Sequence, residues 1–183
     1  MNKLLAVIDY QNDFVTGSLG FDGAAAIDGG IAHQAQAYLA QGDHVLFTYD
    51  THDDLYLETR EGRALPIPHC NPKEQGWRLY GKTQELCCET CANHQIHNIC
   101  KHTFGMPPSE LTKLGSELPD LKEIMVVGVV TNMCVISNAA LLQAQWPEAQ
   151  IIVDASLCRS FDPVLHEKAL DVMQGLQMTV INR

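Results

Sequence analysis

Short apolar runs alternate with longer amphipathic stretches along this chain, and that alternation constrains the fold more than any other feature. Five runs are rich in Val, Ile and Leu: Leu4–Ile8, Val45–Phe47, Ile124–Val127, Ile151–Val153 and Met178–Ile181. Uninterrupted runs of this length are typical of strands buried on both faces, as parallel strands are. The place of Ile96–Lys101 in the alternation indicates a sixth strand.

The stretches between these runs carry apolar residues at helical spacing. Helices are predicted for Ala24–Ala40, from a Ser109 cap through Leu114, for Met133–Gln145, and from Asp162-Pro163 to Gly175. This strand–helix alternation predicts a three-layer α/β/α sandwich around a central, mostly parallel six-stranded sheet, Rossmann-like in architecture. All 183 residues, 1–183, fit a single domain. The stretch Thr51–His97 reads as one long irregular loop, and such loops are usually functional.

Charge and hydropathy exclude several classes of partner. Acidic residues number 22 against 12 basic ones, which gives a net charge of −10. Such a surface repels nucleic acids and anionic membranes. The run Leu4–Ile8 is too short for a signal peptide, and no run approaches the ~20 residues that span a bilayer. We therefore expect a cytoplasmic protein whose seven cysteines are reduced thiols.

Reactive side chains gather where the predicted strands end. Asp9 closes the first strand, Asp50 and His52 follow the second, Lys101 follows the third, and Cys134 comes shortly after the fourth. Ligands of open parallel sheets bind beyond the carboxyl ends of the strands. Although polar residues commonly end strands, a carboxylate, an amine and a thiol at one edge predict a reactive site.

Cys134 is either a nucleophile or a packing residue. Thr131 or Asn132 could cap the following helix, which would place the thiol in the first helical turn. There the positive end of the helix dipole would lower the pKa of the thiol. Most free cysteines instead fill space as small apolar residues. Position alone leaves both readings open.

Three segments resemble the signature segments of the isochorismatase-like cysteine hydrolases: Val7–Phe14, Lys101–Phe104 and Gly128–Val135. Within that superfamily, Tyr49–His52 and Pro66–Cys70 are most similar to the nicotinamidase-related amidases. The resemblance covers nearly the whole chain in the right order. Asn132 departs from it, because an Asp is common at that position.

The resemblance implies an Asp9–Lys101–Cys134 triad that hydrolyses a small carboxamide to a carboxylic acid and ammonia through a thioester. The lysine would favour the thiolate, and the carboxylate would carry the proton. The resemblance also implies an oxyanion hole made by the backbone N–H groups of Val130 and Cys134, with a cis peptide between Val129 and Val130. Members of the superfamily often form dimers or tetramers, so a homo-oligomer is expected.

A divalent metal, commonly zinc, is implied by the same resemblance at Asp50, His52 and His69. One carboxylate and two imidazoles also suit manganese or iron. Glu61 is the candidate fourth ligand, with Glu58 as the alternative. The alternative reading makes both histidines ordinary loop residues.

A second metal site could involve Cys88, Cys91 and Cys100 with His94 or His97, within the cysteine-rich stretch that begins at Cys87. Only one CxxC pair is present, so loop thiols are the default reading.

The substrate pocket is expected to include Phe14, Gln11 and Val129. Phe14 would stack on a planar ring. Three further aromatic residues could line the pocket or pack in the core: Tyr49, Trp77 and Phe104.

Rival functions remain open at this point. Relatives within the superfamily act on N-carbamoyl or ureido compounds, or cleave isochorismate without needing the cysteine or the metal. A non-catalytic interaction protein on the same fold is a further alternative, although all three triad residues are present. A dinucleotide-binding protein is disfavoured, because no G-x-G-x-x-G follows the first strand.

Overall fold

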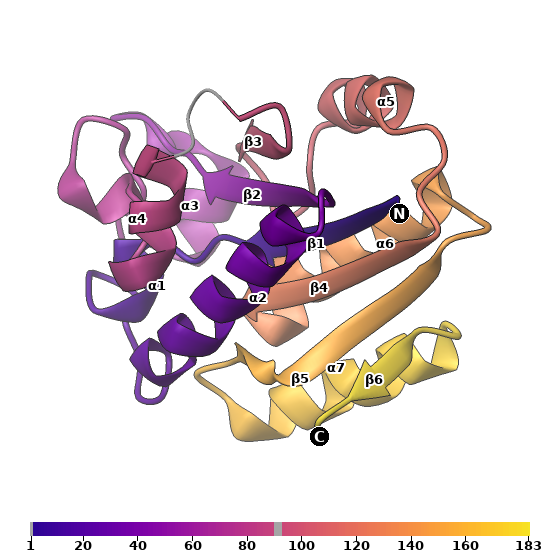
Figure 1. Ribbon diagram of the computed structural model, residues 1–183. Coiled ribbons are helices and arrows are strands. Elements are labelled where there is room, and N and C mark those ends of the chain that lie inside the picture. Colours follow the sequence, from indigo (N-terminus) through magenta and orange to yellow (C-terminus); the bar gives the residue numbers. More distant parts are fainter. Residues whose placement is uncertain (1, 90–92) are drawn as a thin grey trace.

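The computed structural model describes residues 2–89 and 93–183, apart from the side chains of Cys88 and Glu89. Its centre is a six-stranded sheet with the order β3-β2-β1-β4-β5-β6 (Figure 1). The strands are β1 (Lys3–Ile8), β2 (His44–Asp50), β3 (Ile96–Lys101), β4 (Glu123–Val129), β5 (Gln150–Arg159) and β6 (Thr179–Ile181). Neighbouring strands pair in parallel across the sheet. The predicted sheet, including the sixth strand at Ile96–Lys101, is confirmed.

Helices cover both faces of the sheet, as Figure 1 shows. The α-helices are α1 (Asn12–Val15), α2 (Asp28–Ala40), α3 (Arg60–Ala64), α4 (Gly81–Glu89), α5 (Pro108–Glu117), α6 (Ile136–Gln145) and α7 (Pro163–Gly175). Three 3-10 turns are η1 (Ala25–Ile27), η2 (Tyr56–Glu58) and η3 (Gln75–Trp77), and a π-helical turn, η4 (Thr131–Val135), precedes α6. Helices α5, α6 and α7 pack on one face, and α1, α2 and α4 lie over the other.

The core explains why the strands read as continuous apolar runs. Along β1, Leu4 and Ala6 face the cluster beneath α5 and α6, whereas Leu5 and Val7 face the cluster beneath α2. Successive strand side chains point to opposite faces, so a strand covered on both sides must be apolar at every position. No residue of β1 from Leu4 onward is exposed at all.

The helix starts agree only partly with expectation. Asp162 caps α7 as predicted, because its Oδ1 accepts hydrogen bonds from the backbone N–H groups of Val164 and Leu165. The prediction for Ser109 is wrong. Pro107 occupies the cap of α5 without a side-chain hydrogen bond, and Pro108 is the first helical residue. A proline has no N–H to satisfy at this position, so a side-chain cap is less needed.

The stretch Thr51–His97 is not one irregular loop. It contains η2, α3, η3 and α4. These elements have between 3 and 9 residues, which is too short for a 3.6-residue period to be visible in the sequence. Within the described ranges no helix is both long and apolar enough to cross a bilayer.

Candidate active site

Asp9 lies immediately beyond β1, at the carboxyl edge of the sheet, with a backbone φ of 46°. Its side chain is fully buried. Thr48, on the neighbouring strand β2, donates its hydroxyl to Asp9 Oδ1 at 2.6 Å and accepts the Asp9 N–H at 3.0 Å. Strand β2 therefore fixes both the backbone and the carboxylate of Asp9.

Lys101, the last residue of β3, brings the three reactive groups together. Its ammonium Nζ lies 2.7 Å from Asp9 Oδ2 and 3.0 Å from Asp50 Oδ1. It also donates to Cys134 Sγ at 3.5 Å and to the carbonyl oxygen of Thr103 at 3.1 Å. The side chain has no exposed surface. A buried cation thus contacts both the candidate base and the candidate nucleophile.

Burial controls the protonation of this triad. Burial raises the pKa of the Asp9 carboxyl, Lys101 lowers it, and the charge of Asp50 raises it further, so the net direction is upward. Burial disfavours the Lys101 ammonium, but the carboxylate of Asp9, the negative charge that Cys134 carries when ionised, and Asp50 outweigh this and hold the pKa of Lys101 well above the usual value. Asp9 is therefore a stronger proton acceptor than an ordinary aspartate.

The expectation of a low thiol pKa is not met. Burial raises the pKa of Cys134 well above its usual value; Lys101 opposes this, and the charges of Asp9 and Asp50 add to it. Desolvation outweighs any helix dipole here. Burial and the two neighbouring carboxylates therefore disfavour the Cys134 thiolate in the absence of a substrate.

The turn that carries Cys134 also differs from the predicted cap. Residues Thr131–Val135 form a π-helical turn whose cap residue, Val130, makes no side-chain cap hydrogen bond. Thr131 Oγ1 instead lies 2.8 Å from His166 Nδ1, and Asn132 Oδ1 accepts the Ser160 hydroxyl at 2.7 Å. Both side chains tie the cysteine turn to the segment around α7.

Gly128 allows the end of β4 to lie against β1. It pairs with Ile8 in the parallel register and has a φ of +116°, a conformation that favours glycine. A Cβ atom at this position would collide with the carbonyl oxygen of Ile8. The Val129–Val130 peptide that follows is cis, as the resemblance implies. Val130 and Cys134 both line the cavity described below.

A second group of ligand-type atoms adjoins the triad. Asp50 Oδ2 lies 3.0 Å from His52 Nε2 and 3.3 Å from His69 Nε2, and Glu61 Oε1 lies 3.8 Å from His52 Nε2. The four donor atoms all lie within 4.8 Å of one another. Nδ1 of His69 lies 2.8 Å from the carbonyl oxygen of Ile67, where it can donate its proton, which leaves the Nε2 lone pair for a cation. The donor set fits a divalent metal.

The charges within this group also favour a bound cation. Burial raises the pKa of the Glu61 carboxyl, and Asp50 adds to that effect. Burial alone would raise the pKa of Asp50, but the contacts with His52, His69 and Lys101 outweigh burial and lower that pKa. Two carboxylates held this close without a cation repel each other. Glu61, rather than Glu58, is the residue that the fold brings to the histidines.

A cavity of about 580 Å³ opens beside both groups. Four ionisable side chains line it: Asp50, Glu61, His69 and Cys134. The other lining residues are Phe14, Ser18, Leu19, Gly20, Phe21, Ala64, Leu65, Phe104, Val130, Met133 and Phe161. Phe14 packs edge-on against His69 with ring centroids 5.6 Å apart. Phe14 and Phe104 thus line the cavity, and apolar side chains form most of the wall.

Gln11 and Val129 do not belong to the lining, contrary to expectation. The Gln11 side chain is fully buried and clamps the backbone of Asp50: its Nε2 donates to the Asp50 carbonyl at 3.0 Å, and its Oε1 accepts the Asp50 N–H at 2.8 Å. Val129 is buried in the sheet. Gln11 therefore positions the residue that lies between the candidate triad and the candidate metal ligands.

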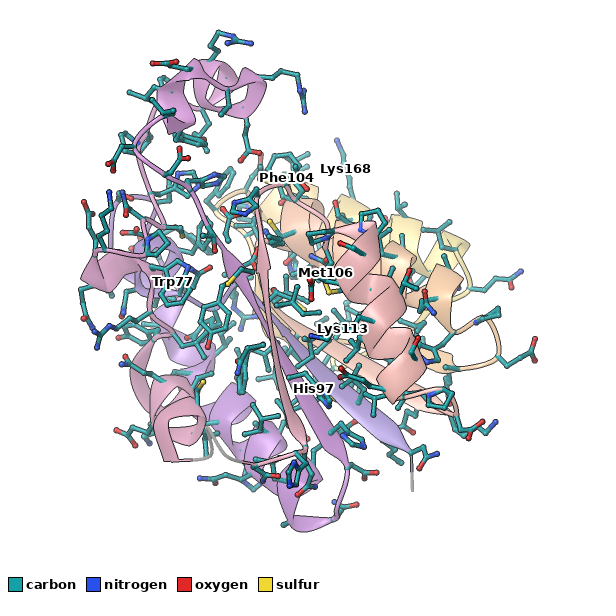
Figure 2. The ribbon with its side chains drawn as sticks, turned by 90° about the horizontal axis from the view of Figure 1, so that it is seen from above. Trp77, His97, Phe104, Met106, Lys113 and Lys168 are labelled. Atoms are coloured by element: carbon teal, nitrogen blue, oxygen red, sulfur yellow. The ribbon has the colours of Figure 1, made fainter. Side chains whose placement is uncertain are left out.

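Tyr49 and Trp77 form a separate aromatic stack, with centroids 4.9 Å apart. Trp77 donates its indole N–H to Thr51 Oγ1 at 2.9 Å. Figure 2 shows Trp77 on the opposite side of the sheet from Met106 and α5. These two rings support the end of β2 and do not line the reactive cavity.

Sequence reasoning missed three aromatic residues near the site. Phe21 and Phe161 line the outer cavity, and Tyr56 packs on His52 with ring centroids 4.4 Å apart. Phe21 and Phe161 lie in segments between elements, where no hydrophobic period marks a residue as important. Only the meeting of distant segments reveals them.

The proposed cysteine zinc site falls partly outside the described residues, because Cys91 and the side chain of Cys88 belong to the undescribed part. His97 makes different contacts: its Nε2 lies 3.2 Å from His44 Nδ1, and its Nδ1 lies 3.5 Å from Glu117 Oε2. Over the part of the chain that the structure describes, Asp50, His52, Glu61 and His69 form the one group suited to a metal.

Comparison with known proteins places these observations in a family. The model of the isochorismatase domain matches residues 3–183. An uncharacterized isochorismatase family protein, PncA of Bacillus subtilis strain 168, is 28% identical over 181 aligned positions, and the match covers 93% of this chain and 93% of that protein.

Solved structures share the fold. The crystal structure of nicotinamidase PncA from Bacillus subtilis superposes with a TM-score of 0.88 at 28% identity, covering 98% of this chain and 99% of that one. Pyrazinamidase/nicotinamidase from Streptococcus mutans gives 0.88 at 27% identity, with the same coverage. Pyrazinamidase of Pyrococcus horikoshii, solved in complex with zinc, gives 0.82 at 19% identity over 99% of both chains, a likeness of fold.

Proposed function

The chain belongs to the isochorismatase family, and from that premise we propose that it is a cysteine amidohydrolase acting on a small, nicotinamide-like carboxamide. The observation that carries this proposal is the position of Lys101 Nζ, 2.7 Å from Asp9 and 3.5 Å from Cys134. The thiol lies on a cavity that also exposes Asp50 and His69. Nicotinamidases from Bacillus subtilis and Streptococcus mutans are similar along nearly their whole length, which supports the same substrate class.

In the first half-reaction Asp9 takes the thiol proton from Cys134, and the sulfur attacks the carboxamide carbon. The raised pKa of Asp9 suits it to accept that proton, and the Lys101 ammonium stabilises the thiolate as it forms. The negative oxygen of the tetrahedral intermediate is assigned to the backbone N–H groups of Val130 and Cys134.

The intermediate collapses when Asp9 returns the proton to the amide nitrogen. The C–N bond breaks, ammonia leaves, and a thioester joins the acyl group to Cys134. Water then attacks the thioester carbon while Asp9 accepts a proton from it. The C–S bond breaks, the sulfur recovers the proton, and the carboxylic acid is released. Lys101 keeps its charge, because Asp50 stays ionised beside it while the negative charge moves between Asp9 and the reacting groups.

Asp50, His52, His69 and Glu61 are proposed to hold a divalent metal, with zinc as the first choice and manganese or iron as alternatives. When bound, the cation would supply a Lewis acid that could attract the ring nitrogen of such a carboxamide. His69 and Asp50 line the cavity that Cys134 also reaches, so one planar ring could contact both groups. The residues of this group therefore orient the substrate.

Ammonia release from a panel of compounds tests the proposal. The panel contains nicotinamide, pyrazinamide, benzamide and a carbamoyl amino acid, with isochorismate cleavage assayed separately. We expect nicotinamide and pyrazinamide to be the best substrates and Cys134→Ala to abolish turnover. Cys158→Ala, at a buried cysteine outside the cavity, is the matched control and should remain active. Preference for the carbamoyl compound or isochorismate would overturn the assignment.

A further inference from the structure

The cavity is larger than a single pyridine carboxamide needs. Its volume of about 580 Å³ lies within the range of roughly 300–1,000 Å³ that holds drug-sized ligands. The ionisable side chains that reach it belong to the triad and the metal-ligand group already described. The remaining wall is largely apolar, and its residues Phe21 and Phe161 have no role in the chemistry proposed for a bare nicotinamide ring.

Two aromatic side chains stand at the outer part of this apolar wall. Phe21 and Phe161 contact each other edge-to-face with ring centroids 6.1 Å apart. Phe161 is 58% exposed although it lines the cavity. Large exposed apolar side chains at a cavity rim are typical of ligand-binding surfaces.

Hydrogen bonds fix both segments that carry these rings. In the loop before Phe21, Leu19 N–H donates to the Asp13 carbonyl at 2.9 Å, and Ser18 N–H donates to Asp13 Oδ1 at 3.3 Å. Next to Phe161, the Ser160 hydroxyl donates to Asn132 Oδ1 at 2.7 Å and accepts the Asp162 N–H at 3.1 Å. The outer wall is therefore largely preformed.

We propose that the substrate is a pyridine carboxamide with an apolar substituent at ring carbon 5, and that Phe161 and Phe21 bind this substituent. The inference rests on the proposed function, because it uses the polar groups to orient the ring. The ring nitrogen and the carboxamide-bearing carbon flank carbon 2, and carbon 5 lies directly opposite. When Asp50, His69 and Cys134 face the edge that contains carbon 2, carbon 5 points away from these three groups, and the rest of the cavity wall is largely apolar.

Steady-state kinetics of the wild-type protein with nicotinamide and 5-propylnicotinamide test the substrate class. Burial of each added methylene favours binding by about fourfold, so we expect kcat/KM for 5-propylnicotinamide to exceed that for nicotinamide by at least about tenfold. An equal or lower kcat/KM for the propyl compound would overturn the inference while leaving the proposed amidase function intact. Failure to hydrolyse any pyridine carboxamide would overturn both.

Substitution at Phe161 tests the residue assignment. Phe161→Ala should reduce the ratio of the two kcat/KM values to within about threefold of unity, because the alkyl chain loses its aromatic contact. Val172→Ala is the matched control, since Val172 is an exposed apolar residue of α7 that does not line the cavity. Its ratio should equal that of the wild type. An unchanged ratio in Phe161→Ala would remove Phe161 from the proposal.

Calorimetry with Cys134→Ala separates binding from turnover. This variant should bind 5-propylnicotinamide at least about tenfold more tightly than nicotinamide, and the double variant Cys134→Ala/Phe161→Ala should lose that difference. Equal affinities in Cys134→Ala would contradict the inference even if the turnover rates differed.

Discussion

Asp50 and Lys101 form an ion pair, with Oδ1 and Nζ 3.0 Å apart, at the ends of two neighbouring parallel strands. The other carboxylate oxygen of Asp50 faces His52 and His69. One carboxylate therefore joins the ammonium that contacts the nucleophile to the candidate metal ligands. The Gln11 side chain holds the backbone of Asp50 in place through two hydrogen bonds.

The shared role of Asp50 predicts a difference between two variants. His52→Ala should slow nicotinamide hydrolysis strongly and benzamide hydrolysis little, because benzamide has no ring nitrogen for a metal. Asp50→Asn should slow both by at least about tenfold, equivalent to about 1.4 kcal/mol, because it also weakens a partner of Lys101. Steady-state kinetics with both amides measure this. Equal benzamide rates in the two variants would show that the Asp50–Lys101 contact is unimportant for chemistry.

Asp9→Asn should lower kcat by at least about 10²-fold, the usual scale for a positioned acid–base group. The amide keeps the shape but cannot accept the thiol proton. Asp154→Asn is the control, because Asp154 is also buried but bonds to Ser156 and Asn182 away from the cavity. Near-normal turnover by Asp9→Asn would place the proton acceptor elsewhere.

Thr48→Val should move the acid limb of the kcat/KM profile to higher pH. The Thr48 hydroxyl donates to the ionised Asp9 carboxylate and so lowers its pKa. Loss of that bond raises the pKa of Asp9, and a higher pH is then needed to generate the carboxylate. Thr48→Ser keeps the hydroxyl and should return the limb to its wild-type position. A limb that does not move in Thr48→Val would mean that another group governs it.

The purified wild-type protein should contain one equivalent of divalent metal by elemental analysis. His52→Ala and His69→Ala should each lower that content greatly, because each removes an imidazole ligand. His44→Ala is the control, since His44 lies at the other end of β2. A wild type with full activity and no metal would contradict the ligand assignment.

Lys101→Ala should destabilise the fold by about 3–5 kcal/mol, because it leaves two buried carboxylates without their cation. Lys113→Ala, at an exposed position of α5 (Figure 2), should change stability by less than about 0.5 kcal/mol. The loss in Lys101→Ala should shrink as the pH falls, because protonated carboxyl groups no longer need the ammonium. Urea unfolding at several pH values measures both effects.

The apolar runs of the sequence were sufficient to predict five of the six strands, because strands covered on both faces must be apolar throughout. Strand β3 is partly exposed and polar, and only its place in the alternation indicated it. The apolar runs predict the lengths of the strands less well. Strand β5 extends from Gln150 to Arg159, well beyond the apolar run Ile151–Val153, since after a register shift it continues to pair with β4 as far as Val129 and Arg159. Helix α4 was missed because a short helix shows little periodicity.

The sequence by itself determined which reactive residue follows which strand. Because parallel strands end at the same edge of a sheet, Asp9, Asp50, Lys101 and Cys134 lie together there. Only the tertiary structure decided their protonation, since the direction of each pKa shift depends on burial and on charges from other strands. Only the tertiary structure also shows that Gln11 binds the backbone of Asp50 instead of lining the cavity, and that Phe21 contacts Phe161. Such contacts join segments far apart in the chain, and no local pattern encodes them.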